Sequence, residues 1–149
     1  MREVMTKSMA RNIFYGGSLF FILIFVGLTA QSHRYIVTQS TDVAGLTESV
    51  KLGKHVWEKH ACINCHTILG EGAYFAPELA NVMTRWGVET SDEGYDALKN
   101  WMQSMPTGIE GRRQMPRFDL TEEEYRGLAD FLLWTDSIRA QDWPPNDAG

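Results

Sequence analysis

Residues 61–79 read ACINCHTILGEGAYFAPEL and contain both cysteines of this 149-residue chain. Cys62 and Cys65 are separated by two residues, and His66 follows directly. A disulfide across so short a loop would constrain the unfolded chain very little, because the stabilisation grows with the length of the loop that is closed. The pair is therefore interpreted through its chemistry and not as a crosslink.

The spacing C-x-x-C-H is typical of the covalent attachment of a c-type haem. Two thiols one helical turn apart can each add to one vinyl group of the same porphyrin, and the adjacent imidazole then binds the iron. The motif predicts that Cys62 and Cys65 attach one haem c and that His66 is an axial ligand of its iron.

A zinc site and a thioredoxin-type redox pair are the competing interpretations of the two cysteines. Zinc needs two further soft ligands, and the remaining histidines, His33, His55 and His60, are interpreted as exposed polar residues. A thioredoxin motif needs a βαβ context, and the sequence has no convincing strand alternation. Both alternatives are therefore less favoured than haem.

A thioether on the sixth coordination position of the iron favours electron transfer over the binding of small molecules. Met115 precedes Pro116 in an irregular stretch just before the last expected helix. Because proline stiffens that loop, Met115 is the predicted second axial ligand. The other candidates after residue 32 are Met83, Met102 and Met105.

Two further features surround the predicted ligands. The carbonyl of Pro77 is expected to accept the other ring N–H of His66, since an axial imidazole usually donates that proton to a carbonyl; the alternative is a simple turn proline. Three arginines flank the methionine, and they either pair with haem propionates or partner acids or form a solvated surface run: Arg112, Arg113 and Arg117.

Residues 12–32 carry no charged side chain. At about 1.5 Å per residue this stretch reaches roughly 31 Å, close to the ~30 Å hydrocarbon thickness of a bilayer. A cleaved signal peptide is the alternative, but a cut after Ala30 would leave the large Leu28 where a small residue is required. We therefore expect an uncleaved transmembrane anchor.

Charges indicate how the anchor is oriented. Residues 1–11 contain Arg2, Lys7 and Arg11, which place this stub in the cytoplasm by the positive-inside rule. The remainder of the chain is then periplasmic in a bacterium, anchored in the inner membrane. Residues 1–33 carry a net charge of +2 and the rest −7. An acidic body argues against nucleic-acid binding.

The soluble part is expected to be all-α. Residues 33–46 are a polar connector, and residues 47–149 form the domain. Helices are predicted at 47–60, with Gly53 in the interior at a cost of roughly 1 kcal/mol, at 94–105, and from Thr121 onward; the last ends before Pro144-Pro145.

Three short helices would bury only a thin core, although the domain is rich in large aromatic residues. A large apolar cofactor at the centre would give these rings a surface to pack on. The residues in question are Trp57, Trp86, Trp101, Phe118, Phe131 and Trp134.

These features together resemble the class I cytochrome c fold, in which the first and last helices cross at a glycine. The stretches CHTILGEGAYFAPEL and GRRQMP, with the MARNIFYGGS anchor and the WPPN tail, are similar to the small, cytochrome c subunit of bacterial nitric oxide reductase. The similarity covers essentially the whole chain. It is far more specific than C-x-x-C-H alone, which marks any c-type cytochrome.

The resemblance implies a non-catalytic electron-transfer subunit of a denitrifying respiratory complex. It would accept electrons from a small periplasmic cytochrome c or blue-copper protein and pass them to a large subunit with haem b. There a haem and a non-haem iron reduce two NO to nitrous oxide and water. In this family the segment after the haem motif also faces a calcium ion between the subunits, which points to the backbone oxygens of Gly72 and Tyr74. The alternatives are a haem sensor or enzyme with an open iron, and a free-standing anchored cytochrome.

Overall fold

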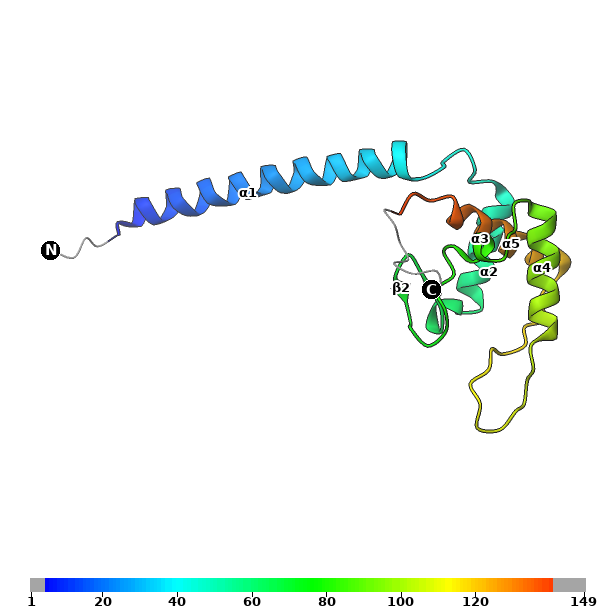
Figure 1. The fold of residues 1–149 in the computed structure, drawn as a ribbon. Coiled ribbons are helices and arrows are strands. Elements are labelled where there is room, and N and C mark those ends of the chain that lie inside the picture. Colours follow the sequence, from blue (N-terminus) through cyan, green and yellow to red (C-terminus); the bar gives the residue numbers. More distant parts are fainter. Residues whose placement is uncertain (1–4, 141–149) are drawn as a thin grey trace. The chain divides into compact units, whose positions relative to one another are not determined.

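The computed structural model describes residues 5–140, which fall into two compact units. Of the described residues, the first unit comprises 5–39 and the second 40–140 (Figure 1). Part of the expected cytoplasmic stub, including Arg2, lies outside the described residues. So do Pro144-Pro145 and the WPPN tail.

The first unit is a single long helix. Helix α1 (Lys7–Tyr35) begins after Thr6, whose side chain accepts a hydrogen bond from the N–H of Met9. A π-helical turn, η1 (Ile36–Ser40), continues it. None of its residues is buried. The helical stretch Lys7–Ser40 contains an 18-residue window of mean hydropathy 2.1, which makes it a candidate membrane span.

The helix continues through the first part of the polar connector expected at residues 33–46, as far as Ser40. Extending an existing helix fixes one residue for each new hydrogen bond, whereas nucleating a helix is costly. Polar residues such as Thr38 are therefore accommodated at its end, and the hydroxyl of Thr38 donates to the carbonyl of Arg34 at 2.8 Å.

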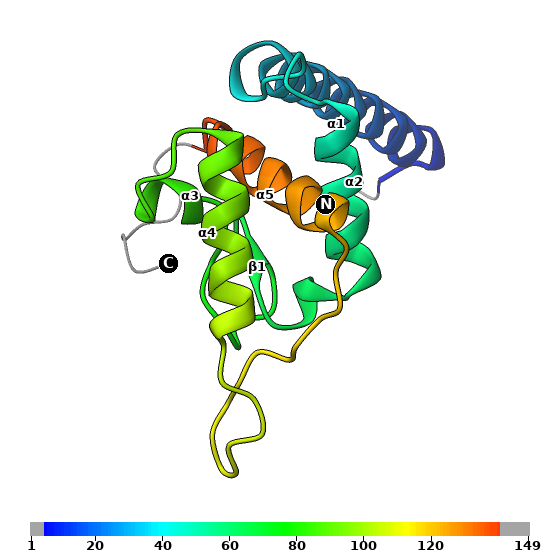
Figure 2. The ribbon, with the colours of Figure 1, turned by 90° about the vertical axis from the view of Figure 1, so that its right-hand side faces the viewer.

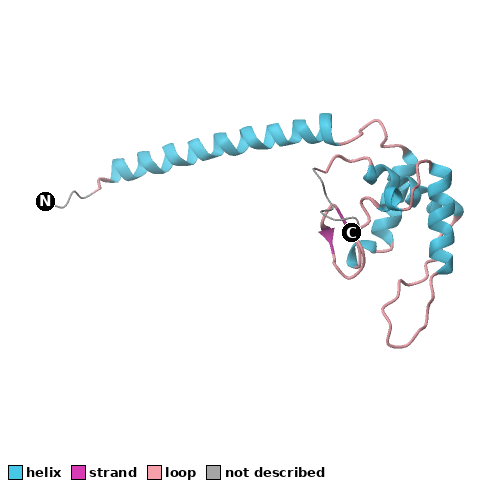
Figure 3. Cartoon of the chain, in the orientation of Figure 1, coloured by secondary structure: helices cyan, strands magenta, loops and turns pink. Residues whose placement is uncertain are grey.

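The second unit is a set of helices joined by long loops, as Figure 3 shows. One small hairpin interrupts the loops, with Thr67 opposite Gly72 and Ile68 opposite Glu71. The elements of the second unit are α2 (Glu48–Lys59), a 3₁₀ turn η2 (Cys62–Asn64), β1 (Thr67–Ile68), β2 (Glu71–Gly72), α3 (Val82–Arg85), α4 (Ser91–Ser104) and α5 (Glu122–Asp136).

Helices α2 and α5 cross in close contact (Figure 2). The crossing lies at two glycines: a Cβ atom added to Gly53 would stand 1.8 Å from the carbonyl oxygen of Gly127. No side chain fits there, which explains why a helix interior tolerates the poorest helix former after proline. The crossing of the domain's first and last helices at a glycine, which the resemblance implies, is confirmed.

The core lies between α2, α3, α4 and α5. Met83 and Val56 are among its largest fully buried side chains. The carboxylate of Asp130 on α5 accepts hydrogen bonds from the hydroxyls of Ser49 on α2 and Ser91 on α4. This one acceptor therefore joins three helices at the edge of the core.

Side-chain caps set where the helices begin. Thr47 caps α2, and Thr121 forms a capping box with Glu124 at the start of α5, as predicted. Helix α4 begins three residues earlier than expected, because Thr90 and Glu93 form a second capping box. Each such box satisfies backbone N–H groups that have no partner within the helix.

The start of the second unit is hydrogen-bonded to the end of α5 and to the residues just after it. The N–H of Arg139 donates to the carbonyl of Ser40 at 2.9 Å, and the hydroxyl of Ser40 donates to the carbonyl of Arg139 at 2.8 Å. The indole of Trp134 donates to the carbonyl of Asp42, also at 2.8 Å. The segment that enters the domain is thus fixed to the end of α5.

A Gly53→Ala variant tests the helix crossing. The added methyl would force α2 and α5 apart, and we expect a loss of about 3 kcal/mol in the free energy of unfolding. Gly94→Ala in α4 is the matched control, because its methyl would meet Val88 at an ordinary 3.5 Å and alanine favours the helix by about 1 kcal/mol. Denaturant unfolding of both variants measures the difference, and equal stability would contradict the close approach.

The contacts of Glu124 at the start of α5 should make the free energy of unfolding depend on pH in the acidic range. The ammonium of Lys59 at 2.7 Å and the capping-box N–H of Thr121 hold the pKa of Glu124 below its ordinary value. The folded state thus binds fewer protons than the unfolded state as pH falls, so this stabilisation is present above the ordinary pKa and is lost as pH falls through the lowered one. Glu124→Gln retains a capping-box acceptor and should flatten the acidic limb of a curve of unfolding free energy against pH. An unchanged limb would contradict this.

Candidate functional site

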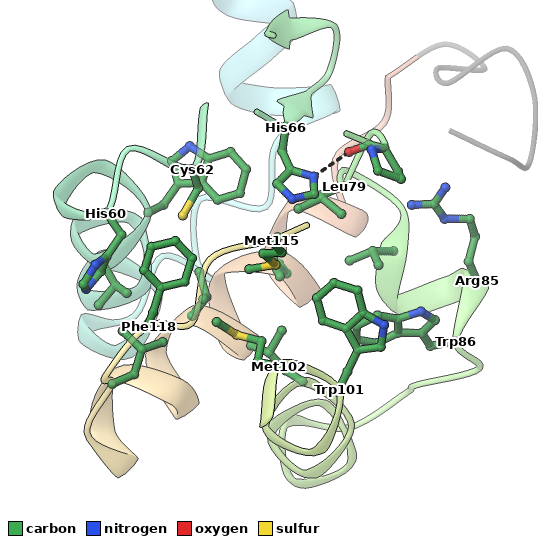
Figure 4. A pocket seen from close by; sticks show the side chains of 18 residues that line it. His60, Cys62, His66, Leu79, Arg85, Trp86, Trp101, Met102, Met115 and Phe118 are labelled. Carbon is green, nitrogen blue, oxygen red and sulfur yellow. Dashed lines mark hydrogen bonds between the residues drawn. The ribbon is translucent and has the colours of Figure 1, made fainter. Parts of the chain in front are cut away.

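Two adjoining cavities of about 250 and 450 Å³ lie within the second unit. The first is walled by the core faces of the helices, and the second by the loops around the cysteine motif. Figure 4 shows the first cavity with its lining side chains. The residues that line both cavities are His60, Cys62, His66, Pro77, Trp101, Met115 and Phe118.

The cysteine motif is a tight turn at the end of α2. Ala61 takes a left-handed conformation with φ 51°, and η2 then folds back so that the N–H of His66 donates to the carbonyl of Cys62 at 2.9 Å. Cys62 lines both cavities and Cys65 lines the second. The thiols are free, and burial raises the pKa of Cys62 above its ordinary value. Both cysteines therefore border a largely apolar space.

His66 is buried and its ring points into the first cavity (Figure 4). Its Nδ1 donates to the carbonyl of Pro77 at 2.8 Å, since a carbonyl oxygen can only accept. The hydrogen bond predicted from the sequence is therefore present. It fixes the ring and leaves Nε2 as the nitrogen that is able to bind a metal.

Met115 lies in the same cavity as His66, and Figure 4 shows the two side chains approaching its centre from different sides. Met102 lines this cavity as well, but it belongs to the buried core of α4. Met83 is fully buried in the core. Met105 lines the second cavity but not the first. The structure thus brings Met115 together with both Cys62 and His66.

The aromatic residues divide into two groups. Trp57, Trp86, Trp101 and Phe118 line the first cavity, in agreement with the expectation that aromatic rings surround a cofactor. Phe131 and Trp134 do not line it; their rings stack on each other at 6.5 Å along α5.

Basic side chains lie at the rim of the cavities. Arg113 lines the second cavity, and its guanidinium lies 4.9 Å from the ring centre of Phe75. Arg117 donates to the carbonyl of Gln103 at 3.0 Å, and Arg112 is exposed. Arg85, which the sequence analysis did not consider, lines the first cavity. The choice between a propionate role and a surface role for the three arginines of the methionine loop stays open.

The interpretation of His60 as an exposed polar residue is wrong. The residue is half-buried, lines both cavities, and packs edge-to-face against Phe118 at 5.2 Å. Its Nε2 atom is buried and has no hydrogen-bond partner among the described residues. His60 is the C-cap residue of α2, so the end of that helix places its ring beside the cavities. His33 and His55 are exposed, as expected.

Gly72 and Tyr74 lie on the exposed loop that follows the motif. Gly72 closes the hairpin with φ 129°, and a Cβ atom there would stand 2.2 Å from the carbonyl oxygen of His66. Tyr74 is 75% exposed, and its hydroxyl donates to the carbonyl of Gly70. The loop therefore presents backbone to solvent next to the cysteine motif.

The chemistry of the cavities fits a haem. Their walls are mostly apolar, as a porphyrin requires, and the same space receives two free thiols, an oriented imidazole and a thioether. His60 lines the same space, and its buried Nε2 has no hydrogen-bond partner among the described residues. These are the donor types that covalent attachment and axial ligation of haem c use.

Comparison with known proteins gives the same result. Residues 50–136 match the cytochrome c family. Over the full length of both chains, the protein is 68% identical to the C subunit of nitric oxide reductase from Paracoccus denitrificans. It is 62% identical to the protein of that name from Cereibacter sphaeroides and 49% identical to that from Stutzerimonas stutzeri, again over their full lengths.

The mostly helical fold that the sequence predicts is confirmed, as is the long apolar helix at its start. A cytochrome c domain also implies a covalent haem c. Matches at this level of identity over whole chains leave one conclusion. The chain belongs to the family of nitric oxide reductase C subunits.

Proposed function

We propose that this protein is the electron-transfer subunit of a nitric oxide reductase complex and performs no catalysis itself. The observation that carries the proposal is its identity, along the whole chain, to proteins named as the C subunit of nitric oxide reductase. The chain takes electrons from a small periplasmic donor, a cytochrome c or a blue-copper protein. It passes them to a large membrane subunit where haem b and a non-haem iron convert two NO to nitrous oxide and water.

The residues assigned to the cofactor are Cys62 and Cys65 as the covalent attachment points and His66 and Met115 as the axial ligands. The four side chains share adjoining cavities, which supports this assignment. When bound, the haem supplies an iron that gains and loses one electron at a time. Ligation by both an imidazole and a thioether leaves no position for substrate.

The protein residues around the cofactor perform three tasks in this proposal. Pro77 holds the His66 ring through the hydrogen bond at 2.8 Å, which fixes the ring and raises its basicity as a ligand. Apolar walls, including Leu98, Leu128 and Leu132, exclude water. A dry and rigid surrounding reorganises little when the charge at the centre changes, which favours fast electron transfer.

The membrane arrangement follows from α1. We assign residues 12–32 to the hydrophobic span, residues 1–11 to the cytoplasm, and residues 47–149 to the periplasmic face of the bacterial inner membrane. The exposed apolar surface of α1 supports the span, and Lys7 and Arg11 before it support the orientation.

A calcium ion at the interface with the large subunit is the final part of the proposal. Its ligands from this chain are the backbone oxygens of Gly72 and Tyr74. The exposure of their loop supports this assignment, since calcium commonly takes backbone carbonyls among its oxygen ligands.

Replacing Met115 tests the axial ligand. We expect Met115→Ala to lose the weak sulfur-to-iron absorption at ~700 nm and to bind carbon monoxide promptly when reduced, because the sixth position opens. Met102→Ala is the control, since Met102 lines the same cavity and should keep the band. A band that survives in Met115→Ala, or prompt binding of carbon monoxide by the unaltered protein, would contradict the proposed ligand set.

Extraction in mild detergent tests the complex. We expect the chain to elute with a larger membrane protein, and pyridine haemochrome analysis of that fraction should report haem b together with haem c. The measurement needs no variant. Elution of the chain alone, with haem c only, would favour a free-standing anchored cytochrome.

A further inference from the structure

A buried carboxyl group follows Pro77, whose carbonyl accepts a hydrogen bond from the predicted ligand His66. Glu78 is only 4% exposed, although acidic side chains are almost never buried unless they have partners. Its Oε1 accepts from the N–H of Leu69 at 3.0 Å and from that of Ala80 at 2.9 Å, and its Oε2 accepts from the N–H of Gly70 at 3.1 Å. Both oxygens accept from backbone N–H groups, an environment that favours the carboxylate form.

These hydrogen bonds hold a turn that the chain does not adopt readily. Leu69 and Gly70 both have positive φ values, 53° and 81°, and a leucine in this region is strained. Their N–H groups point toward the Glu78 carboxylate instead of toward a neighbouring strand. Hydrogen bonds to a charged group stabilise more than those between neutral groups, so these three stabilise the turn.

The same turn belongs to the segment that carries His66. The chain leaves His66 through β1 into the Leu69–Gly70 turn, and it returns to Pro77, whose carbonyl accepts from the imidazole at 2.8 Å. Two backbone hydrogen bonds join the outgoing and returning stretches: Ala76 N–H to the Cys65 carbonyl at 2.8 Å, and Leu79 N–H to the Thr67 carbonyl at 2.9 Å. The Glu78 side chain extends this connection across the turn.

A second contact fixes Glu78 at its backbone. Its carbonyl accepts from the guanidinium of Arg85 on α3, which lines the first cavity. Glu78 is therefore held from α3 on one side while its own side chain holds residues 69 and 70 on the other. Pro77 lies directly before this fixed point.

We propose that Glu78 is the positioning residue for His66: by holding the 69–70 turn and residue 80, its carboxylate keeps the Pro77 carbonyl on the His66 imidazole and sets the reduction potential of the haem. The inference rests on the proposed role of His66 as an axial ligand. It assigns a defined effect on the iron to a carboxylate that lies outside the set of iron ligands.

The direction of the effect follows from two causes with the same sign. A carbonyl held on Nδ1 makes the imidazole a more basic ligand, which favours the oxidised iron. A buried negative charge also favours the oxidised iron, because little water screens it. Removing the carboxylate weakens both, so the midpoint potential should move to more positive values.

Three variants of the full-length, haem-loaded chain test this. Glu78→Gln keeps the shape and removes the charge, and we expect a more positive midpoint potential together with exchange of the His66 ring N–H that is at least about tenfold faster, the factor for about 1.4 kcal/mol. Glu78→Asp keeps the carboxylate and should restore most of the potential. Glu71→Gln, on the exposed strand of the same hairpin, removes an equal charge and should leave the potential unchanged.

The outcomes separate the inference from the proposed function. An unaltered protein without the spectrum of histidine and methionine ligation contradicts the proposed function before any variant is compared. With that spectrum intact, an unchanged potential in Glu78→Gln would overturn the positioning role. So would an equal shift in Glu71→Gln, or a shift in Glu78→Asp as large as that in Glu78→Gln.

Amide hydrogen exchange of the unaltered protein tests the role of Glu78 even if Glu78→Gln fails to accumulate with haem. The amide protons of Leu69, Gly70 and Ala80 should exchange as slowly as those of the buried residues of α5, because the carboxylate holds them. Fast exchange of these three amides would show that the turn opens freely, and would overturn the inference.

Discussion

The close approach of α2 and α5 at Gly53 and Gly127 is the constraint on which the rest of the domain depends. Because no side chain separates the two backbones, the end of α2 is set firmly against the last helix. The cysteine motif begins at that end, and Met115 lies in the loop that leads into α5. One pair of glycines thus fixes, through two different helices, the parts of the chain that carry the side chains proposed to bind the haem.

The second constraint is that the helices do not fill their own centre. Two cavities adjoin the core, and residues as large as Trp57, Trp86 and Trp101 line one of them. A porphyrin placed there would complete the apolar interior. The cofactor would then contribute to folding as well as to electron transfer, as is usual when a bound group stabilises only the folded state.

Much of this was predictable from the sequence, because the signals are local. The C-x-x-C-H motif, the Thr121–Glu124 capping box and the glycine in α2 each follow from a few adjacent residues. The hydrogen bond from His66 to Pro77 was expected because an axial imidazole, the role predicted for His66, usually donates its other N–H to a carbonyl. The early start of α4 also had a local signal, the Thr90–Glu93 box.

What could not be predicted depends on contacts between distant or irregular segments. Glu78 has no hydrophobic periodicity around it, and its burial follows from backbone N–H groups that only the folded turn brings together. His60 caps the end of α2 and packs against Phe118, a residue 58 positions further along the chain. The extension of α1 to Ser40 reflects helix cooperativity, which outweighs the polar composition of residues 33–40.

The paired hydrogen bonds between Ser40 and Arg139, with that from Trp134 to Asp42, have a mechanical consequence. A force transmitted along α1 reaches these hydrogen bonds as it enters the domain, and they pass it to the C-terminal end of α5. These contacts lie at the C-terminal end of α5, whereas Met115 precedes its N-terminal end. Movement of the membrane helix therefore enters the domain at a distance along α5 from the loop that carries Met115.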